Sequence, residues 1–233
     1  MALSSPSNLA AAWRSDAQAH ARRPALDPAA RQAVLDDLAL RVRPTTGAHE
    51  RTLPVAEPFA AVLPSLTRGA VISIDGPAGV GATSLAFGLA AAATRAGEWA
   101  AAVDVDDTLN ALAAQECGVI LDRFVVARRI PVAQWAATVA ALLDGTTCVL
   151  ACVPPQLRAG DARRLVAKAR ERATALVALG PWPAEAAWRV RVSASQWSAF
   201  GPDAAFLHGA RTLDADIEGR GLAPGRRVFA LAS

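Results

Sequence analysis

The segment Ile72–Ser84 constrains the fold of this chain more than any other part of the sequence. A short β-branched run, a glycine-rich turn and the start of an alanine-rich helix follow one another there, which is the order found in a phosphate-binding loop. Gly76 and Gly81 keep the spacing of the pattern G-x-x-x-x-G-K-[ST], with Gly79 between them. Thr83 stands where the hydroxyl that binds magnesium belongs. The segment therefore predicts an α/β fold built around this loop.

The loop lacks the cation that the motif normally carries. Ala82 occupies the position of the lysine that contacts the β- and γ-phosphates. Backbone N–H groups and the start of the helix can still hold an anion, because neither needs that side chain. Loss of a charged hydrogen bond worth about 1.5–3 kcal/mol predicts a roughly 10- to 200-fold weaker affinity. Lys168, the only lysine, lies far along the chain, and Arg95 would lie roughly 20 Å from Gly81 on the same helix.

We therefore predict a degenerate phosphate-binding site, with at most weak ATP binding, no other cofactor and no metal. Its residues are Gly76, Gly79, Gly81, Ala82, Thr83 and Ser84. A second loss supports this prediction. The apolar run Cys148–Val153 is typical of a buried strand, and Cys152 or a close neighbour stands where a magnesium-binding aspartate would end it. Two losses, one on each side of the phosphates, predict that the chain is not an enzyme.

From Gly69 onward, runs typical of strands and helices alternate. Strands are expected at 71–74, 99–105, 124–126, 148–153 and 176–179, and helices at 82–95, 110–116 and 131–143. This alternation predicts a parallel sheet with crossover helices. Three late strands, at 188–192, 211–217 and 226–231, are expected as antiparallel additions.

A basic helix is expected between the strands at 148–153 and 176–179, with Asp161 as its cap. One arc of it would carry Leu165, Val166, Ala169, Ala173 and Leu176, and the other Arg163, Arg164, Lys168 and Arg172. The basic arc is either a solvated outer face or a contact surface for DNA or protein.

Residues 1–50 are predicted to form a helical N-terminal extension and linker, and residues 51–233 the core domain. A helix is expected over Asp27–Arg41, because an aspartate can cap it and a proline suits its first turn. A Thr-Thr-Gly turn and two prolines then break the pattern, which places the boundary near residue 50. The extension is either a loosely docked arm or an organised helix that binds a partner.

The composition argues against a membrane protein and against a disulfide scaffold. Hydrophobic residues make up 53% of the 233 positions, but no apolar run approaches the roughly 18 residues of a membrane-spanning helix. No signal-peptide pattern opens the sequence, so a cytoplasmic location is expected. Cys148 and Cys152 would lie about 13 Å apart on one strand, too far for a disulfide, and are interpreted as buried structural thiols. A net charge of +3 permits a nucleic-acid or acidic-protein partner without requiring either.

From about Leu63 onward, the chain resembles the core of the RecA family. The matching segments are LPSLTRG, GPAGVGATSL at the phosphate loop, VDVDDTLN, ECGVILDRFVVAR and TTCVLACVPPQL. The resemblance implies a RecA-like P-loop core with a mainly parallel sheet and antiparallel C-terminal strands. It also places Asp106 where the family has the glutamate that activates water. Asp106 is either a residual base or part of a polar loop that caps the next helix, and the missing lysine and metal site favour the loop.

The chain departs from the RecA family in its second half. Only residues 180–187 separate the strands expected around Leu179 and Trp188, where the family has a long DNA-contacting loop. We also expect no C-terminal DNA-gateway domain of the kind found in the RecA family. We therefore expect neither filament formation nor strand exchange.

What remains resembles the degenerate ImuA-type proteins of actinobacteria (ImuA'), which are encoded with the inactive Y-family polymerase ImuB and an error-prone C-family DNA polymerase. The resemblance implies a non-catalytic adaptor in SOS-induced translesion DNA synthesis and mutagenesis. Its expected partners are ImuB and the C-family polymerase, with RecA or DNA as weaker ones and no membrane. Trp182, between two prolines, is the expected exposed contact. The alternatives are a P-loop ATPase that lacks the usual lysine and a cell-division regulator of the SOS response.

Overall fold

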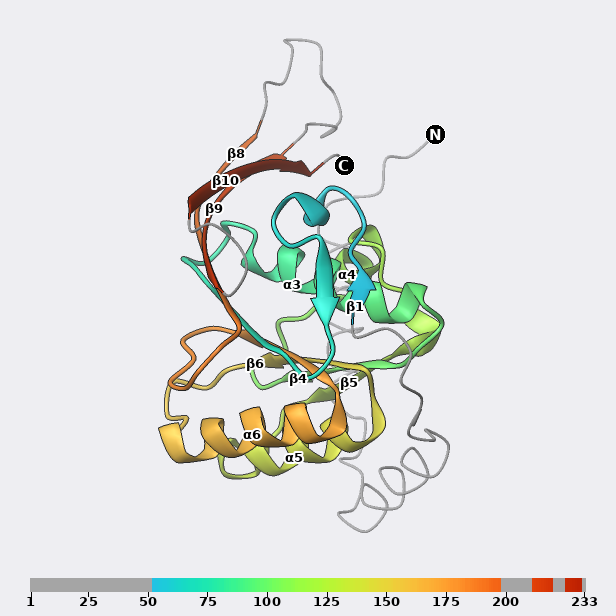
Figure 1. Ribbon diagram of the computed structural model, residues 1–233, viewed down its shortest axis with the longest axis vertical. Helices are drawn as coiled ribbons and strands as arrows, with labels where there is room; N and C mark the ends of the chain where they lie inside the picture. Colours follow the sequence, from blue (N-terminus) through green and yellow to red (C-terminus); the bar gives the residue numbers. More distant parts are fainter. Residues whose placement is uncertain (1–51, 198–210, 220–224, 232–233) are drawn as a thin grey trace, which may run out of the picture. The chain divides into compact units, whose positions relative to one another are not determined.

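An eight-stranded sheet forms the centre of this computed structural model, which describes residues 52–197, 211–219 and 225–231 (Figure 1). Its strands are β3 (Val71–Asp75), β4 (Ala100–Asp104), β5 (Phe124–Arg128), β6 (Cys148–Cys152), β7 (Ala175–Leu179), β8 (Trp188–Trp197), β9 (Arg211–Gly219) and β10 (Gly225–Leu231). Their order is β10-β9-β8-β3-β7-β6-β4-β5. A separate two-stranded sheet pairs β1 (Thr52–Pro54) with β2 (Ser65–Thr67). The predicted extension over 1–50, its helix and its boundary lie outside the described residues.

Most neighbouring strands of the large sheet run parallel. The strands β5, β4, β6, β7 and β3 pair in parallel, whereas β9 pairs antiparallel with both β8 and β10. The predicted α/β class, with a mainly parallel sheet and some antiparallel strands, is confirmed. The prediction for β8 is wrong in part: this strand is antiparallel to β9 but parallel to β3, with Ile72 opposite Trp188 and Asp75 opposite Arg191.

The segment 180–187 accounts for the direction of β8. It carries the chain from the end of β7 past β3 to the start of β8. The N–H of Gly180 donates to the carbonyl of Ile74 (2.8 Å), and the N–H of Ala187 donates to the carbonyl of Val71 (2.7 Å). Eight extended residues span about 26 Å, more than the length of the five-residue strand β3. The segment expected as a short loop is therefore a crossover that returns the chain to the amino-terminal end of the parallel strands, where β8 begins beside β3.

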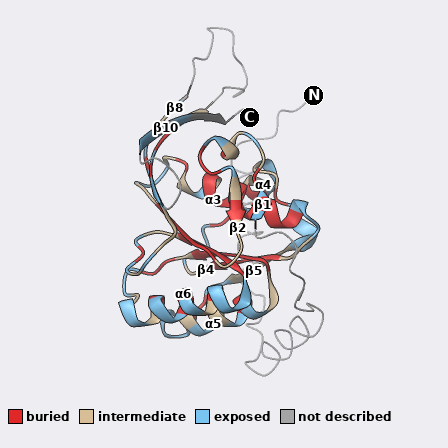
Figure 2. Cartoon of the chain, in the orientation of Figure 1, coloured by how far each residue is buried: buried red, intermediate tan, exposed pale blue. Residues whose placement is uncertain are grey.

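Helices pack on both faces of the parallel strands. α3 (Ala82–Arg95) and α4 (Ala111–Glu116) contribute to one buried core, and α5 (Val132–Gly145) and α6 (Ala159–Arg172) to a second core on the other face. The 3₁₀ helices η1 (Phe59–Ala61) and η2 (Leu121–Arg123) lie in connections. Figure 2 shows buried residues concentrated in the strands, while α6 keeps an exposed outer face. None of the helices in the described residues is long and apolar enough to span a membrane.

The limits of α6 differ from the prediction. The helix begins after Arg158, so Asp161 lies in its first turn instead of capping it. It ends at Arg172, because Ala173 adopts a left-handed conformation with φ 52°. Leu176 consequently belongs to β7 and not to the apolar arc of the helix. By contrast, α3 has the predicted limits, from Ala82 to Arg95.

Trp135 and Cys148 lie in the core, whereas Cys152, also predicted as a buried thiol, is only partly buried. Trp135 on α5 is fully buried, and its Nε1 donates to the carbonyl of Cys152 (2.8 Å). Cys148 and Cys152 share β6, and the three cysteines of the chain are free thiols. Burial raises the pKa of both Cys148 and Cys152 to about 12 and that of Cys117 to about 11. These thiols pack as weakly polar groups rather than as reactive ones.

Glu98 connects three loops at the amino-terminal ends of the parallel strands, the end opposite the phosphate loop. Its carboxylate accepts hydrogen bonds from both guanidinium nitrogens of Arg68 (3.0 and 2.5 Å) and from the hydroxyl of Thr147. Burial alone would raise the pKa of Glu98, but the hydrogen bonds from Arg68 and Thr147 outweigh it and hold this pKa below the ordinary value. The ionised carboxylate is therefore favoured in the folded chain.

We expect Glu98→Gln to lower the free energy of unfolding by about 2 kcal/mol at neutral pH, because charged hydrogen bonds become neutral ones. A lowered carboxyl pKa stabilises the fold above its ordinary value, and this stabilisation is lost as the pH falls through the lowered pKa. The difference between wild type and variant should therefore shrink below pH 4.5. Urea unfolding at several pH values measures it, with the exposed Glu116→Gln as control. A difference that stays constant with pH would contradict this role.

Candidate functional site

The predicted phosphate-loop residues lie together between β3 and α3. Gly76, Gly79, Gly81, Ala82, Thr83 and Ser84 all line one pocket of about 300 Å³, together with Asp75, Leu179, Gly180 and Arg211. Gly79 (φ 81°) and Gly81 (φ 102°) adopt left-handed conformations that other residues rarely take, and Gly81 is the N-cap of α3. The structure therefore brings the residues of the predicted loop together around one pocket, and their role in phosphate binding stays a prediction.

Arg211 is the residue of this pocket that sequence reasoning missed. Its Nη2 donates to the carbonyl of Gly79, which is 132 positions away in the chain, and to the hydroxyl of Ser195 (3.3 Å) on β8. No local spacing in the sequence relates Arg211 to the loop, because the start of β9 is brought there by the pairing of β8, β9 and β3. Arg95, by contrast, donates its Nε to the carbonyl of Gly118 (3.2 Å).

The pocket thus has one guanidinium, but that group is bonded to the loop itself. A free lysine at position 82 would point its charge at a bound phosphate, whereas Arg211 directs one nitrogen to a backbone carbonyl. Because Nη2 already donates to Gly79 and Ser195, a bound phosphate would share this guanidinium with the loop. Chemically, the site combines a glycine-rich backbone, the hydroxyl groups of Thr83 and Ser84, and a guanidinium bonded to the loop.

The acidic residues near the carboxyl ends of the strands serve local structure. Asp75 accepts from the N–H of Gly76 (2.8 Å). Asp104 is buried and accepts from the N–H groups of Thr108 (3.0 Å) and Leu109 (2.9 Å). Asp104 thus orders the loop before α4, but the cap of that helix is Asn110, whose Oδ1 accepts from the N–H of Leu112 (2.8 Å). Asp106 lies exposed in the same loop. Among the described residues, no cluster of three His, Cys, Asp or Glu side chains could hold a metal ion.

Asp107, an exposed residue of the same loop, binds two arginines. It receives hydrogen bonds from Arg129 (2.8 Å) and Arg128 (2.5 Å), and both guanidinium groups hold the pKa of Asp107 below its ordinary value. Asp107 and Arg129 both adopt left-handed backbone conformations, with φ of 58° and 54°. These contacts join the turn after β4 to the end of β5.

Trp182 does not occupy the exposed position expected of it. The indole is only 6% exposed and packs in the core formed with α5 and α6. Its Nε1 donates to the carbonyl of Glu185 (3.2 Å). The expectation failed because the segment 180–187 is a crossover lying along the sheet, so its large apolar side chain turns inward.

The comparison with known protein families covers this same region. The model of the MT3502 N-terminal domain family matches residues 61–184, which is more than half of the chain. The chain belongs to this family. The matched residues include the phosphate loop and Trp182, whereas Arg211 lies beyond them. No curated protein matches the chain.

Proposed function

We propose that this chain is a cytoplasmic, non-catalytic adaptor with a RecA-like core, acting in SOS-induced translesion DNA synthesis and mutagenesis. Its proposed partners are ImuB and an error-prone C-family polymerase, with RecA or DNA bound more weakly. One observation carries the non-catalytic part: Ala82 replaces the lysine, and Arg211 is bonded to the carbonyl of Gly79. A site so arranged lacks the free cation on which phosphoryl transfer depends.

The fold supports the RecA-like part of the proposal. The glycine-rich loop follows a central parallel strand, and antiparallel strands are added at the C-terminal side of the sheet. That is the arrangement the resemblance to the RecA family implies. The segment 180–187 spans the distance from β7 to β8, so it is too short to form a DNA-contacting loop as well. A fold that keeps its scaffold but lacks catalytic groups is compatible with the function of an adaptor.

The adaptor function is tested with the chain and its polymerase partners in cells. We expect Thr83→Ala to leave damage-induced mutation frequency and co-purification of the polymerase subunits nearly unchanged. The hydroxyl has little phosphate-specific binding energy to add in a loop whose cation and opposing carboxylate are missing. Mutation frequency after ultraviolet irradiation measures the first quantity and affinity purification the second. Loss of mutagenesis in a folded Thr83→Ala chain would replace the adaptor with a nucleotide switch.

One observation favours a second candidate, an ATPase that uses arginine in place of the lysine: Arg211 lines the phosphate pocket. The variant Arg211→Ala separates the two functions. If Arg211 closes the loop, the variant loses about 1–3 kcal/mol of stability through its charged hydrogen bond to Gly79, and neither chain turns over ATP.

The measurements are urea unfolding, phosphate release with magnesium and binding of fluorescent ATP. Arg191→Ala, an exposed residue on the neighbouring strand β8, is the matched control. Phosphate release by the wild type, together with ATP binding that Arg211→Ala weakens 10-fold or more, would establish the ATPase candidate instead.

A further inference from the structure

A groove of about 710 Å³ lies between α6 and the crossover segment 180–187. The helix contributes Arg163, Val166, Ala167 and Arg170, which are three, four and seven positions apart and so share one face. The other wall is formed by Trp182, Pro183, Ala184 and Glu185, with Arg189 from β8. The groove is separate from the phosphate pocket, with which it shares no lining residue.

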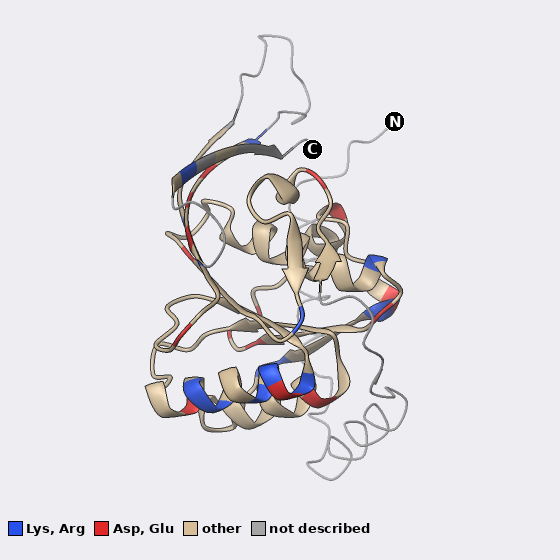
Figure 3. Ribbon diagram, in the orientation of Figure 1, with Lys and Arg blue, Asp and Glu red and all other residues tan. Residues whose placement is uncertain are grey.

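The basic arc predicted for α6 divides into two parts in the structure. Lys168 (2.7 Å) and Arg172 (2.8 Å) both pair with Asp144 of α5, so these two cations fasten one helix to the other. Arg164 pairs with Asp161 on its own helix (3.4 Å). Arg163 makes no ion pair with any residue that the structure describes. Figure 3 shows these charges along α6.

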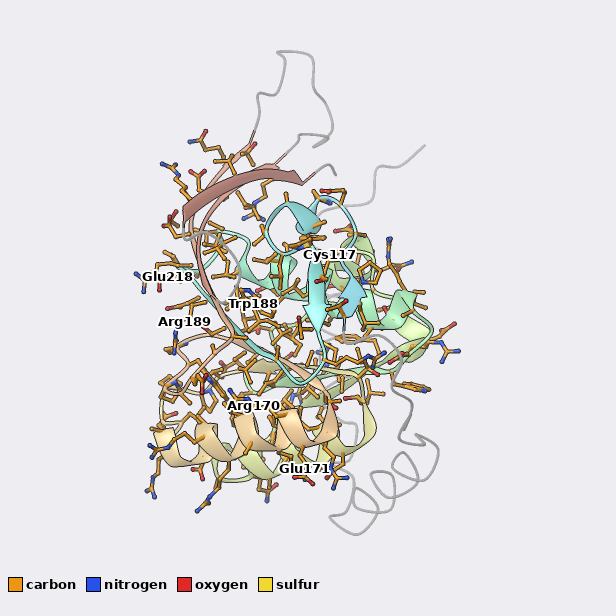
Figure 4. The ribbon with its side chains drawn as sticks, viewed as in Figure 1. Cys117, Arg170, Glu171, Trp188, Arg189 and Glu218 are labelled. Carbon is orange, nitrogen blue, oxygen red and sulfur yellow. The ribbon has the colours of Figure 1, made fainter. Side chains whose placement is uncertain are left out.

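The groove carries more positive than negative charge. Three guanidinium groups, those of Arg163, Arg170 and Arg189, line it with the single carboxylate of Glu185. Arg163 and Arg170 begin about 10 Å apart along the helix axis. Arg170 and Arg189 are labelled in Figure 4, on α6 and β8. Positive charge is therefore spread along the groove rather than gathered at one point.

The contacts already made in the groove show which groups its arginines bind. Arg170 pairs with the carboxylate of Glu185 (3.2 Å). Arg189 donates to the main-chain carbonyls of Trp182 (3.4 Å) and Ala184 (2.5 Å). Carboxylates and main-chain carbonyls are the two acceptors that an acidic peptide brings.

An apolar strip runs between the cations. Val166 and Trp182 are each 6% exposed, and Ala167 and Pro183 lie exposed beside them. An apolar side chain of a bound peptide would be covered there and would add hydrophobic contact. A nucleic-acid backbone has no matching group, and the buried indole of Trp182 is closed to base stacking.

We infer that this groove binds an acidic peptide segment of a partner protein, with an apolar residue between its acidic ones. The groove would be one docking surface of the adaptor proposed above, and its assignment rests on that function. Charge complementarity selects the segment, because Arg163 is open to a carboxylate and the Arg170–Glu185 pair can exchange its acid for another. The apolar strip then distinguishes this segment from a purely acidic one.

Fluorescence anisotropy with the full chain tests the inference. The probe is a labelled dodecapeptide of aspartates and glutamates with a leucine in every third position. We expect Arg163→Gln to weaken its binding roughly 10-fold, through loss of a charged hydrogen bond. Arg164→Gln, on the same helix but outside the groove and 85% exposed, should leave binding unchanged. Replacement of the acids by amides should abolish binding, and replacement of leucine by serine should weaken it.

Equal weakening by Arg163→Gln and Arg164→Gln would overturn the inference, because attraction would then depend on overall charge alone. So would an oligo-dT strand that binds more tightly than the peptide and depends on Arg163. If Arg163→Gln weakens peptide binding but no polymerase subunit co-purifies with the chain, the groove is retained as a peptide site and the adaptor function is rejected. Co-purification of the subunits without peptide binding would retain the adaptor and reject the groove.

Discussion

We expect Trp182→Ala to lower the free energy of unfolding by about 3–5 kcal/mol, the range for truncation of a large buried aromatic side chain. The indole is 6% exposed and fills the core between the crossover segment and α6. Its Nε1–H bond joins Trp182 to the carbonyl of Glu185 within the crossover, and removal of the ring leaves this carbonyl without that donor. Equilibrium unfolding in urea, followed by circular dichroism, measures the loss.

Trp182→Phe is the matched control for this substitution. The phenyl ring retains most of the apolar volume but no N–H, so it should cost about 1–2 kcal/mol, between wild type and alanine. A loss below 1 kcal/mol for Trp182→Ala would contradict a core position. Weakened partner binding in Trp182→Ala would reflect displacement of the groove wall, and the measurement must be made below the unfolding range of the variant.

Gly76→Ala is expected to cost about 3 kcal/mol, at the upper end of the range for overpacking. A Cβ atom at this position would lie 2.4 Å from the carbonyl oxygen of Val192. That oxygen belongs to the backbone of β8, where Val192 pairs with Ala215 of β9, so moving it would disturb this pairing. The first glycine of the phosphate loop is thus required for packing against a neighbouring strand, whatever the loop binds.

Gly79→Ala is the comparison that separates packing from backbone conformation. Nothing lies within 4 Å of a Cβ built on Gly79, whose φ is 81°, so only the left-handed conformation is penalised, by about 1 kcal/mol. Thermal unfolding should therefore rank wild type above Gly79→Ala and Gly79→Ala above Gly76→Ala. Equal losses in the two variants would show that β8 moves aside.

The sequence was sufficient to predict those helices and strands whose limits depend on their own residues alone. The limits of α3 follow from a glycine N-cap and an alanine-rich run, and β6 follows from an uninterrupted apolar run. Gly76, Gly79 and Gly81 were placed in the loop for the same reason. Such patterns predict which helix or strand forms and where it lies along the chain.

Two features missed in the sequence, Arg211 and the burial of Trp182, depend on residues that are distant in the chain. Arg211 reaches Gly79 only because β9 pairs with β8, and β8 with β3. Trp182 is buried because β8 runs parallel to β3, a direction that alternation of apolar residues does not specify. The wrong cap at Asp161 has a local cause: an acidic residue suits the first turn of a helix as well as its cap.

The three cysteines bear on how this chain responds to oxidants. With pKa values of about 11 for Cys117 and about 12 for Cys148 and Cys152, the reactive thiolate makes up roughly one part in ten thousand or less at neutral pH. Peroxide and alkylating reagents should therefore modify the native thiols slowly. A cysteine introduced in place of Arg163 would be the fast-reacting thiol, so a dye could be attached at the groove without first removing the natural ones.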